Sequence, residues 1–226
     1  MKDYCKGCIV KEKGIFSSLL GNQKSKISCI MDLHRYRKKQ ILFLEGNPSH
    51  HIYAIKSGIV KIFKTTEEGK DHILRILNDG DLLAFDAIYS NEYNYSAEVI
   101  ENSEICMMKK DDFIALLKED ADLAIEIIKI LTHELEEARC SIRDLTTKTA
   151  FQKVAWLLLS LPNIFSSGND LKRTITLPLS RKELSDMLGL SPETVSRILS
   201  QFEQDNIVKI SGKKILVLAP RKLSSI

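Results

Sequence analysis

The sequence lacks the features that mark membrane and secreted proteins. No apolar run reaches the roughly 18 residues that a membrane-spanning helix needs. The charged stretch 1–14 contains no apolar core of the kind that a signal peptide requires. Cysteine is scarce, and its odd count of five argues against a secreted disulfide framework. We therefore expect a protein of the reducing cytoplasm, without a membrane partner.

Enzyme signatures are missing as well. The sequence contains no Gly-rich phosphate-binding loop, no nucleophile elbow and no H-E-x-x-H metal motif. His50 and His51 are adjacent, whereas two metal ligands on one face of a strand must be separated by another residue. These absences predict that the protein is not an enzyme.

What the sequence does contain is an uneven distribution of charge. The formal net charge is only +3, but residues 148–226 carry 12 Lys and Arg against 6 Asp and Glu. The remaining residues carry 21 against 24. A basic C-terminal part on a slightly acidic body is typical of proteins that bind nucleic acid, and chance variation of surface charge is the alternative.

Short runs of β-branched and aromatic residues dominate the stretch 41–108. Turn signals separate these runs, namely Glu45-Gly-Asn-Pro48, Ser57-Gly58, Glu68-Gly69 and Asn78-Asp-Gly-Asp81. Short strands at this spacing predict a β sandwich or roll. We therefore divide the first half of the chain into a cysteine-bearing arm, 1–14, and a β-roll domain, 15–118.

A heptad pattern follows in residues 119–147. Seven apolar residues recur at alternating spacings of four and three, as in a coiled-coil seam: Ala124, Ile128, Leu131, Leu135, Ala138, Ile142 and Leu145. A second apolar stripe, Leu123, Ile127 and Ile130, is suited to cover the roll. Two stripes on one helix favour a homodimer over a helix that packs only on its own domain.

Residues 148–226 are expected to form a C-terminal domain. Its first helix is strongly apolar, and Pro162 predicts the end of that helix. Its last part alternates two β runs, 207–210 and 215–218, with a basic glycine turn between them. This is the pattern of a β-hairpin, and Lys213 and Lys214 in its turn are suited to contact phosphate.

Two adjacent helices are predicted between these parts. Ser180 and Glu183 have the spacing of a capping box, and Gly189 is suited to end the helix that they begin. Ser191 caps a second helix that has Pro192 in its first position. A helix, a glycine turn and a second helix make a helix-turn-helix, and the hairpin adds a wing.

The second of these helices carries polar residues on the face opposite its apolar one. Arg197 can donate two hydrogen bonds to guanine, and Glu193 can accept one from cytosine. Hydroxyl side chains can contact a base or a phosphate. The candidate DNA-contacting residues of the domain are Ser180, Arg181, Ser191, Glu193, Thr194, Ser196, Arg197, Ser200, Lys213 and Lys214.

At this point the chain resembles a known family, the CRP–FNR transcription regulators, over nearly its whole length. Glu193-Thr-Val-Ser-Arg197 matches the E-x-x-S-R pattern of the FNR branch, and the segments 53–58 and 80–88 of the roll also look FNR-like. The resemblance implies an α+β fold: a cyclic-nucleotide-binding-type β jelly roll as sensor, a long dimerisation helix and a C-terminal winged helix-turn-helix. It also implies palindromic double-stranded DNA with TTGAT-like half-sites, and RNA polymerase as a partner.

The resemblance further implies an oxygen or nitric oxide signal, because FNR proteins bind a [4Fe–4S] cluster through cysteines. Three positions carry over as metal ligands: Cys5, Cys8 and Cys106. Gly14 stands where the family has its last arm cysteine, so Cys29, Asp3 or another carboxylate would have to complete the set. The alternative is the same DNA-binding regulator under another effector: haem, thiol redox, zinc or a different small ligand.

Two other departures bear on regulation. Cyclic AMP binders of the family carry a glutamate and an arginine in the roll, whereas this chain has Asp86 and Tyr95 there. Without a cation for the cyclic phosphate, cyclic AMP is not the expected ligand. Ala138 replaces an acidic residue that weakens FNR dimers, so the dimer is expected to form with or without a cofactor.

Overall fold

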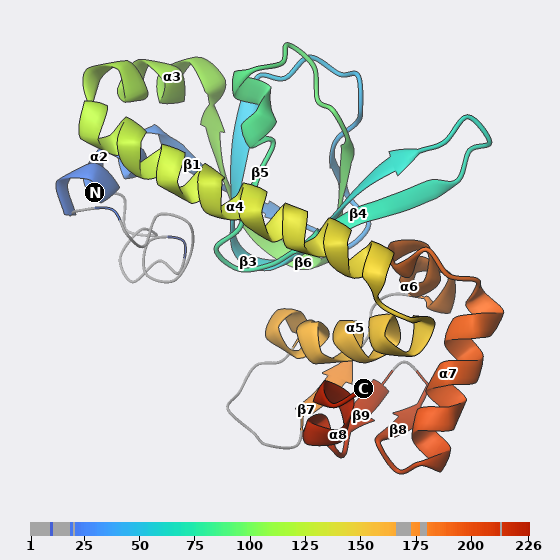
Figure 1. Cartoon of the computed structure of the whole chain (residues 1–226). Coiled ribbons are helices and arrows are strands. Elements are labelled where there is room, and N and C mark those ends of the chain that lie inside the picture. The colour runs from blue at the N-terminus through green and yellow to red at the C-terminus, as the bar shows by residue number, and fades with distance from the viewer. Residues whose placement is uncertain (1–9, 11–18, 20, 166–172, 177–179, 213) are drawn as a thin grey trace. The chain divides into compact units, whose positions relative to one another are not determined.

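The computed structural model describes residues 10, 19, 21–165, 173–176, 180–212 and 214–226, and the chain divides into two compact units, 1–136 and 137–226. The first unit contains a six-stranded antiparallel sheet with the order β1-β6-β3-β4, in which β2 pairs with β6 and β5 with β3 (Figure 1). Its strands are β1 (Met31–Tyr36), β2 (Ile41–Phe43), β3 (His51–Thr65), β4 (Asp71–Leu77), β5 (Leu82–Leu83) and β6 (Ser96–Lys109). The helices of this unit are α2 (Gly21–Ile30), a short 3-10 turn (Phe85–Ile88), α3 (Lys110–Glu119) and the first part of α4 (Ala121–Thr147).

Two apolar cores lie on opposite faces of this sheet. Successive strand residues point to opposite faces, so β6 sends Ile105 into one core and Cys106 into the other. The core with Ile105 fills the inside of the roll and includes a stack of Phe43 on Tyr93, whose ring centroids are 4.1 Å apart. The core with Cys106 lies under α2, α3 and α4 and contains the fully buried Phe113.

The expected turn at Ser57-Gly58 is wrong, because β3 continues through it as a single strand. The register with β6 shifts between Ile55 and Val60, which is the signature of a β-bulge. Gly58 has φ 109°, and a Cβ atom there would lie 2.1 Å from the hydroxyl oxygen of Ser103. The glycine therefore serves a close approach of two strands and not a chain reversal, which hydropathy patterns do not distinguish.

Helix α4 presents two different apolar faces. Asp120 begins it by accepting a hydrogen bond from the amide of Leu123 at 3.0 Å. Leu123 and Ile127 are buried in the core under the helices, as their stripe predicted. The large residues of the heptad seam remain between 39% and 64% exposed: Ile128, Leu131, Leu135, Ile142 and Leu145. An ion pair of 2.8 Å joins Arg75 of β4 to Glu134, which lies one helical turn beyond Ile130 on the same face of α4 as the buried stripe.

The second unit contains α5 (Ala150–Phe165), α6 (Arg181–Leu188), α7 (Pro192–Gln204), α8 (Pro220–Ser224) and a three-stranded sheet. The strand order is β7-β9-β8, with β7 (Arg173–Thr176), β8 (Val208–Ser211) and β9 (Lys214–Val217). Phe151 of α5 packs edge-on against Phe202 of α7, with 6.0 Å between the ring centroids. The expected α+β class, with a jelly roll, a long helix and a winged helix-turn-helix, is confirmed.

Sequence reasoning misplaced one boundary in this unit and missed one strand. Helix α5 does not end before Pro162 but continues to Phe165. Pro162 stands in the last turn, where the missing N–H costs a single intrahelical hydrogen bond. Strand β7 was not predicted, because its four residues become a strand only through pairing with β9.

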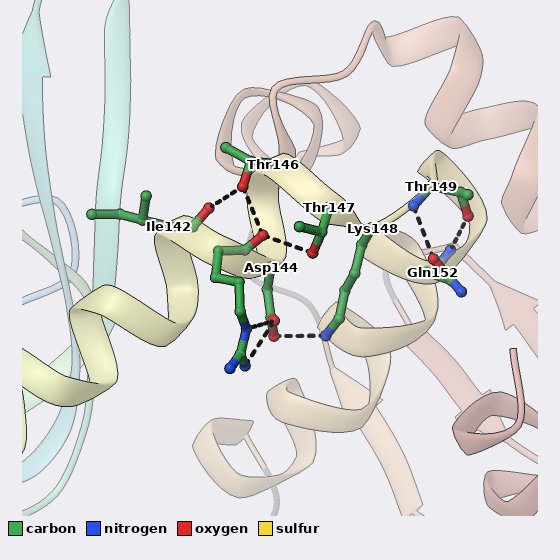
Figure 2. A network of polar contacts seen from close by, with 8 residues as sticks. Ile142, Asp144, Thr146, Thr147, Lys148, Thr149 and Gln152 are labelled. Atoms are coloured by element: carbon green, nitrogen blue, oxygen red, sulfur yellow. Dashed lines mark hydrogen bonds and ion pairs between the residues drawn. The ribbon is translucent and has the colours of Figure 1, made fainter.

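A network of polar contacts joins the end of α4 to the start of α5 (Figure 2). Asp144 accepts from Lys148 at 2.7 Å and from Arg143 at 3.2 Å. Thr149 and Gln152 then form a reciprocal cap at the start of α5, at 3.0 and 3.3 Å. The pKa of Asp144 is held below its ordinary value, chiefly by the ammonium of Lys148. The junction between the two helices is therefore fixed by charged and capping hydrogen bonds.

Candidate nucleic-acid interface

The start of α6 is built as its sequence predicted. The hydroxyl of Ser180 accepts from the amide of Glu183 at 3.2 Å, and the Glu183 carboxylate accepts from the amide of Ser180 at 2.8 Å. Gly189 closes the helix with φ 61°, a left-handed conformation that glycine adopts without strain. Arg181, in the first helical position, is exposed. The capping box thus fixes where α6 ends and the next helix begins.

Helix α7 follows after one short turn. The hydroxyl of Ser191 accepts from the amide of Thr194 at 3.2 Å, and Pro192 occupies the first helical position. Four apolar residues at helical spacing are at most 2% exposed and anchor the helix: Val195, Ile198, Leu199 and Phe202. A helix that is buried this completely along one face presents a rigid opposite face.

The opposite face of α7 carries the polar residues that the sequence singled out. Glu193, Arg197 and Ser200 are exposed, and Thr194 and Ser196 are half-buried. Within the described part of the chain, Arg197 forms no ion pair or hydrogen bond, so its five donors are available to a ligand. The pKa of Glu193 is lowered by hydrogen bonds from its own amide and from Ser191, which keeps the carboxylate ionised. The face therefore presents the available donors of Arg197 and the carboxylate acceptor of Glu193.

The predicted hairpin is present after α7. Strands β8 and β9 pair antiparallel, with Ser211 opposite Lys214, and Gly212 turns the chain with φ 60°. Lys214 opens β9, whereas Lys213 lies outside the described residues.

One contact between α7 and the hairpin was not predicted from the sequence. The carboxylate of Glu203, near the end of α7, accepts a hydrogen bond from the amide of Ile210 in β8 at 2.8 Å. This hydrogen bond connects the hairpin to the helix. No local sequence pattern predicts a bond between these two residues, which are seven positions apart.

The cysteine residues are distributed unevenly. Cys106 is 1% exposed within β6, and Cys29 is exposed on α2. Cys5 and Cys8, like Asp3 and Gly14, lie outside the described residues. Among the residues that the structure does describe, no three His, Cys, Asp or Glu side chains gather as metal ligands. The described residues therefore supply one buried thiol, Cys106, to the expected ligand set.

Tyr95 and Asp86, which stand where the family resemblance places the arginine and glutamate of cyclic AMP binders, both bond to neighbouring residues. The hydroxyl of Tyr95 accepts a hydrogen bond from the amide of Ala84 at 2.9 Å. The carboxylate of Asp86 accepts from the side-chain amide of Asn94 at 2.7 Å, and burial raises the pKa of Tyr95 well above its usual range. A phenol and a carboxylate at this place offer no cation to a phosphate.

A capped helix-turn-helix with an exposed polar second helix and a β wing defines the winged-helix class of DNA-binding proteins. Two family models match the chain: the cyclic nucleotide-binding domain over residues 33–120 and the Crp-like helix-turn-helix domain over residues 152–226. No described helix is long and apolar enough to cross a membrane.

Curated relatives extend the match over both units. The fumarate and nitrate reduction regulatory protein of Yersinia pestis is 28% identical, covering 95% of this chain and 86% of that protein. The transcriptional activator protein anr of Pseudomonas aeruginosa is 26% identical, covering 95% and 88%. Among solved structures, FixK2 from Bradyrhizobium japonicum superposes with a TM-score of 0.76 at 26% identity, covering 87% of this chain and 96% of that one. The chain belongs to the CRP–FNR family of DNA-binding transcription regulators, a family of regulators rather than enzymes.

Proposed function

We propose that the protein reads a palindromic DNA site as a homodimer, by placing α7 of each protomer in a major groove. The observation that carries this proposal is the exposed face of α7, on which Glu193 and Arg197 stand on a helix anchored from behind. Arg197 is assigned to a guanine and Glu193 to a cytosine, with Ser196 between them. The E-x-x-S-R pattern supports TTGAT-like half-sites about one helical turn apart.

Other candidate residues would contact the DNA backbone. Ser180, Arg181 and Ser191 stand at the two helix starts, where amides and hydroxyls commonly bind phosphate. Thr194 and Ser200 flank the base-reading residues on α7. Lys213 and Lys214 are assigned to phosphates beside the groove. Such contacts would add affinity and salt dependence without adding sequence choice.

The dimer is proposed to form along the exposed seam of α4. Five large apolar side chains at heptad spacing are exposed on a helix whose other stripe is already buried. The seam residues are Ala124, Ile128, Leu131, Leu135, Ala138, Ile142 and Leu145. Burying such a stripe against its two-fold copy is the common solution for a closed dimer.

DNase footprinting on a synthetic operator with two TTGAT half-sites tests this assignment. We expect protection of both half-sites by the wild-type chain and loss of protection when one half-site is scrambled. Half-sites moved apart by five base pairs would face opposite sides of the duplex, and undiminished binding to that operator would contradict the dimeric geometry. Since one relative is named a transcriptional activator, we include RNA polymerase as a partner in the proposal.

We further propose that the roll reports a redox or gas signal, oxygen or nitric oxide, through a [4Fe–4S] cluster. Cys5, Cys8 and Cys106 would hold it, and the cluster would supply sensitivity to oxygen when bound. The buried thiol of Cys106 faces the core under the helices, and Val10, the described residue nearest to Cys8 in sequence, is buried in the same core. The exposure of Cys29 on α2 disfavours it as the fourth ligand. The phenol of Tyr95, at the position of the arginine in cyclic AMP binders, supports an effector other than cyclic AMP.

Purification without air tests the sensing proposal separately from the DNA proposal. Iron and acid-labile sulfide are expected in the wild-type chain and in Cys140→Ser, whose thiol lies on α4. Both should be lost in Cys106→Ser. A colourless protein whose affinity for the operator is the same with and without air would exclude the cluster but leave the DNA assignment intact. Zinc in place of iron would favour the alternative metal.

A further inference from the structure

A small pocket opens at one end of the β-roll, where β3 begins and β6 runs into α3. Its volume is about 190 Å³, and its lining consists of His50, His51, Lys109, Lys110 and Asp111. His51 and Lys109 are directly opposite each other in the antiparallel ladder. The amide of Lys110 donates to the carbonyl of His50 at 2.9 Å. Backbone pairing therefore brings the five side chains together, and none of them belongs to the DNA or cysteine sites.

The charge of this pocket is unbalanced. Two lysines face a single carboxylate, and among the described residues neither Lys109 nor Lys110 forms an ion pair. The ammonium of Lys110 instead approaches two neutral oxygens, the carbonyl of Ser90 at 3.3 Å and the hydroxyl of Ser49 at 3.5 Å. Both contacts are long for a charged donor, so the ammonium keeps hydrogen-bonding capacity for an anion.

The pKa of His51 is affected both by burial and by nearby positive charge. Its pKa is lowered first by burial and then by the nearby His50, Lys109 and His34. Tyr93 and Tyr53 are its other titratable neighbours: the hydroxyl of Tyr93 meets the backbone of His51 at 3.2 Å, and the ring of Tyr53 lies 6.4 Å away. Both side chains are phenols and not carboxylates, so neither compensates the cations.

The composition of the lining selects among ligands. Described residues do not assemble three metal ligands here, and two lysines would repel a cation. The volume is below the roughly 300 Å³ at which pockets for drug-sized ligands begin, so a small anion fits and a nucleotide does not. Asp111 would repel a fully ionised anion, but its carboxylate can accept a hydrogen bond from an anion that keeps a proton. Inorganic phosphate keeps at least one proton at neutral pH, because its second ionisation leaves a dianion that still carries a P–OH group, whereas sulfate carries none.

We propose that this pocket binds a protonated phosphate group, as inorganic phosphate or as a small phosphate monoester. The ammonium groups of Lys109 and Lys110 neutralise its charge, the two imidazoles donate hydrogen bonds to its oxygens, and the carboxylate of Asp111 accepts a hydrogen bond from the remaining P–OH group. Free phosphate supplies that hydrogen as the monohydrogen form, and a monoester supplies it only when singly protonated. The two sources are therefore distinguishable by pH.

Calorimetric titration of the full chain with inorganic phosphate, at pH 7 and constant ionic strength, tests the proposal. We expect saturable binding of one phosphate per chain and no saturation with sulfate. Glycerol phosphate is the second probe: if it binds more tightly than inorganic phosphate at pH 6, the monoester is the source. Binding of sulfate as tight as that of phosphate would overturn the assigned role of Asp111.

Variants on exposed positions localise the binding. Lys109→Gln should weaken it about tenfold, which corresponds to one charge-assisted hydrogen bond. Lys118→Gln, an equal loss of charge at the other end of α3, is the matched control and should change nothing. Asp111→Asn should let sulfate bind. Equal weakening by Lys109→Gln and Lys118→Gln would indicate general charge screening and overturn the site.

An imidazole titration by NMR gives a second readout that does not depend on affinity. Saturating phosphate should raise the pKa of His51, because an adjacent anion stabilises the imidazolium. His50→Gln is a second variant of the lining at an exposed position, so the test does not depend on the folding of a single variant. It should also weaken phosphate binding. A His51 pKa that is unchanged at phosphate concentrations that saturate the calorimetric signal would place the anion elsewhere and refute the proposal.

Discussion

The carboxylate of Glu203 on α7 holds the amide of Ile210 on β8, with 2.8 Å between oxygen and nitrogen. The residues that are assigned to bases stand on α7, and the lysines that are assigned to phosphate stand in the hairpin. The contact is therefore the link by which one helix sets the position of the wing. It is a single hydrogen bond from an exposed side chain, so its removal should loosen the wing without unfolding the domain.

Glu203→Ala is expected to weaken operator binding about fivefold, the equivalent of one ordinary hydrogen bond. Sequence preference should stay the same, since α7 keeps its buried face. Glu203→Gln retains an acceptor oxygen and should bind nearly as the wild type does, and Gln204→Ala removes a neighbouring exposed side chain as a control. Fluorescence anisotropy with labelled operator measures all three. Equal loss of operator binding in Gln204→Ala and Glu203→Ala would show that the hydrogen bond between Glu203 and Ile210 is not the cause of the weakening.

Arg197→Ala should abolish discrimination between the operator and scrambled DNA, because a bidentate contact to guanine contributes about 1–3 kcal/mol for each half-site. Weak binding that falls steeply with salt should remain, since phosphate contacts are untouched. Arg197→Lys keeps the charge but not the two-pronged geometry, so it should recover affinity without specificity. Unchanged preference in Arg197→Ala would mean that another residue reads the base.

Local sequence patterns predicted the structure correctly where a residue type at a given spacing has a single structural role. Ser180, Glu183, Gly189 and Ser191 are caps, and all four cap helices in the structure as their spacing predicted. The apolar stripes of α7 and of the start of α4 are buried for the same reason: helical periodicity alone decides which face is apolar.

Features that depend on distant partners were not readable from local patterns. Gly58 looked like a turn residue, and only the approach of Ser103 from β6 explains it. Strand β7 forms because its backbone pairs with that of β9. The hydrogen bond between Glu203 and Ile210 forms only when the hairpin folds back on α7. At the candidate DNA site, helical spacing predicted which residues share the polar face of α7. That these side chains are exposed follows from the packing of the opposite face.

Leu135→Asp should convert the dimer to monomers, because the seam would bury an unpaired carboxylate in each protomer. Leu44→Asp is the matched control: Leu44 is 48% exposed and Leu135 is 51% exposed, but Leu44 follows β2 and lies outside the seam. Sedimentation velocity distinguishes the two variants from the wild type. Dimers that persist in Leu135→Asp at micromolar concentration would contradict the proposed interface.

Acid should loosen the junction between α4 and α5 through Asp144. Because the pKa of Asp144 is lowered in the folded chain, the stabilisation is present above the pKa of the unfolded chain, about 3.9, and is lost as the pH falls through the pKa of the folded chain. The side chains are partly solvated, so the effect is modest. Trp156 is the only tryptophan and lies 5.4 Å from the ammonium of Lys148, so its fluorescence reports on this junction. Asp144→Asn should remove part of the fluorescence change between pH 5 and 3, and an identical acid titration would assign that change to other groups.

Gly58→Ala should destabilise the roll far more than an ordinary glycine substitution does. Its Cβ would meet the side chain of Ser103 at 2.1 Å and its Cα at 2.7 Å, so truncating that side chain cannot relieve the clash fully. Gly69 also has a positive φ, of 75°, but a Cβ there meets nothing within 4 Å. Gly69→Ala should therefore cost only the backbone strain of about 1–2 kcal/mol, and Gly58→Ala should exceed it by at least about 1 kcal/mol in urea unfolding. Equal losses in the two variants would mean that the strands separate easily and that the bulge does not require glycine.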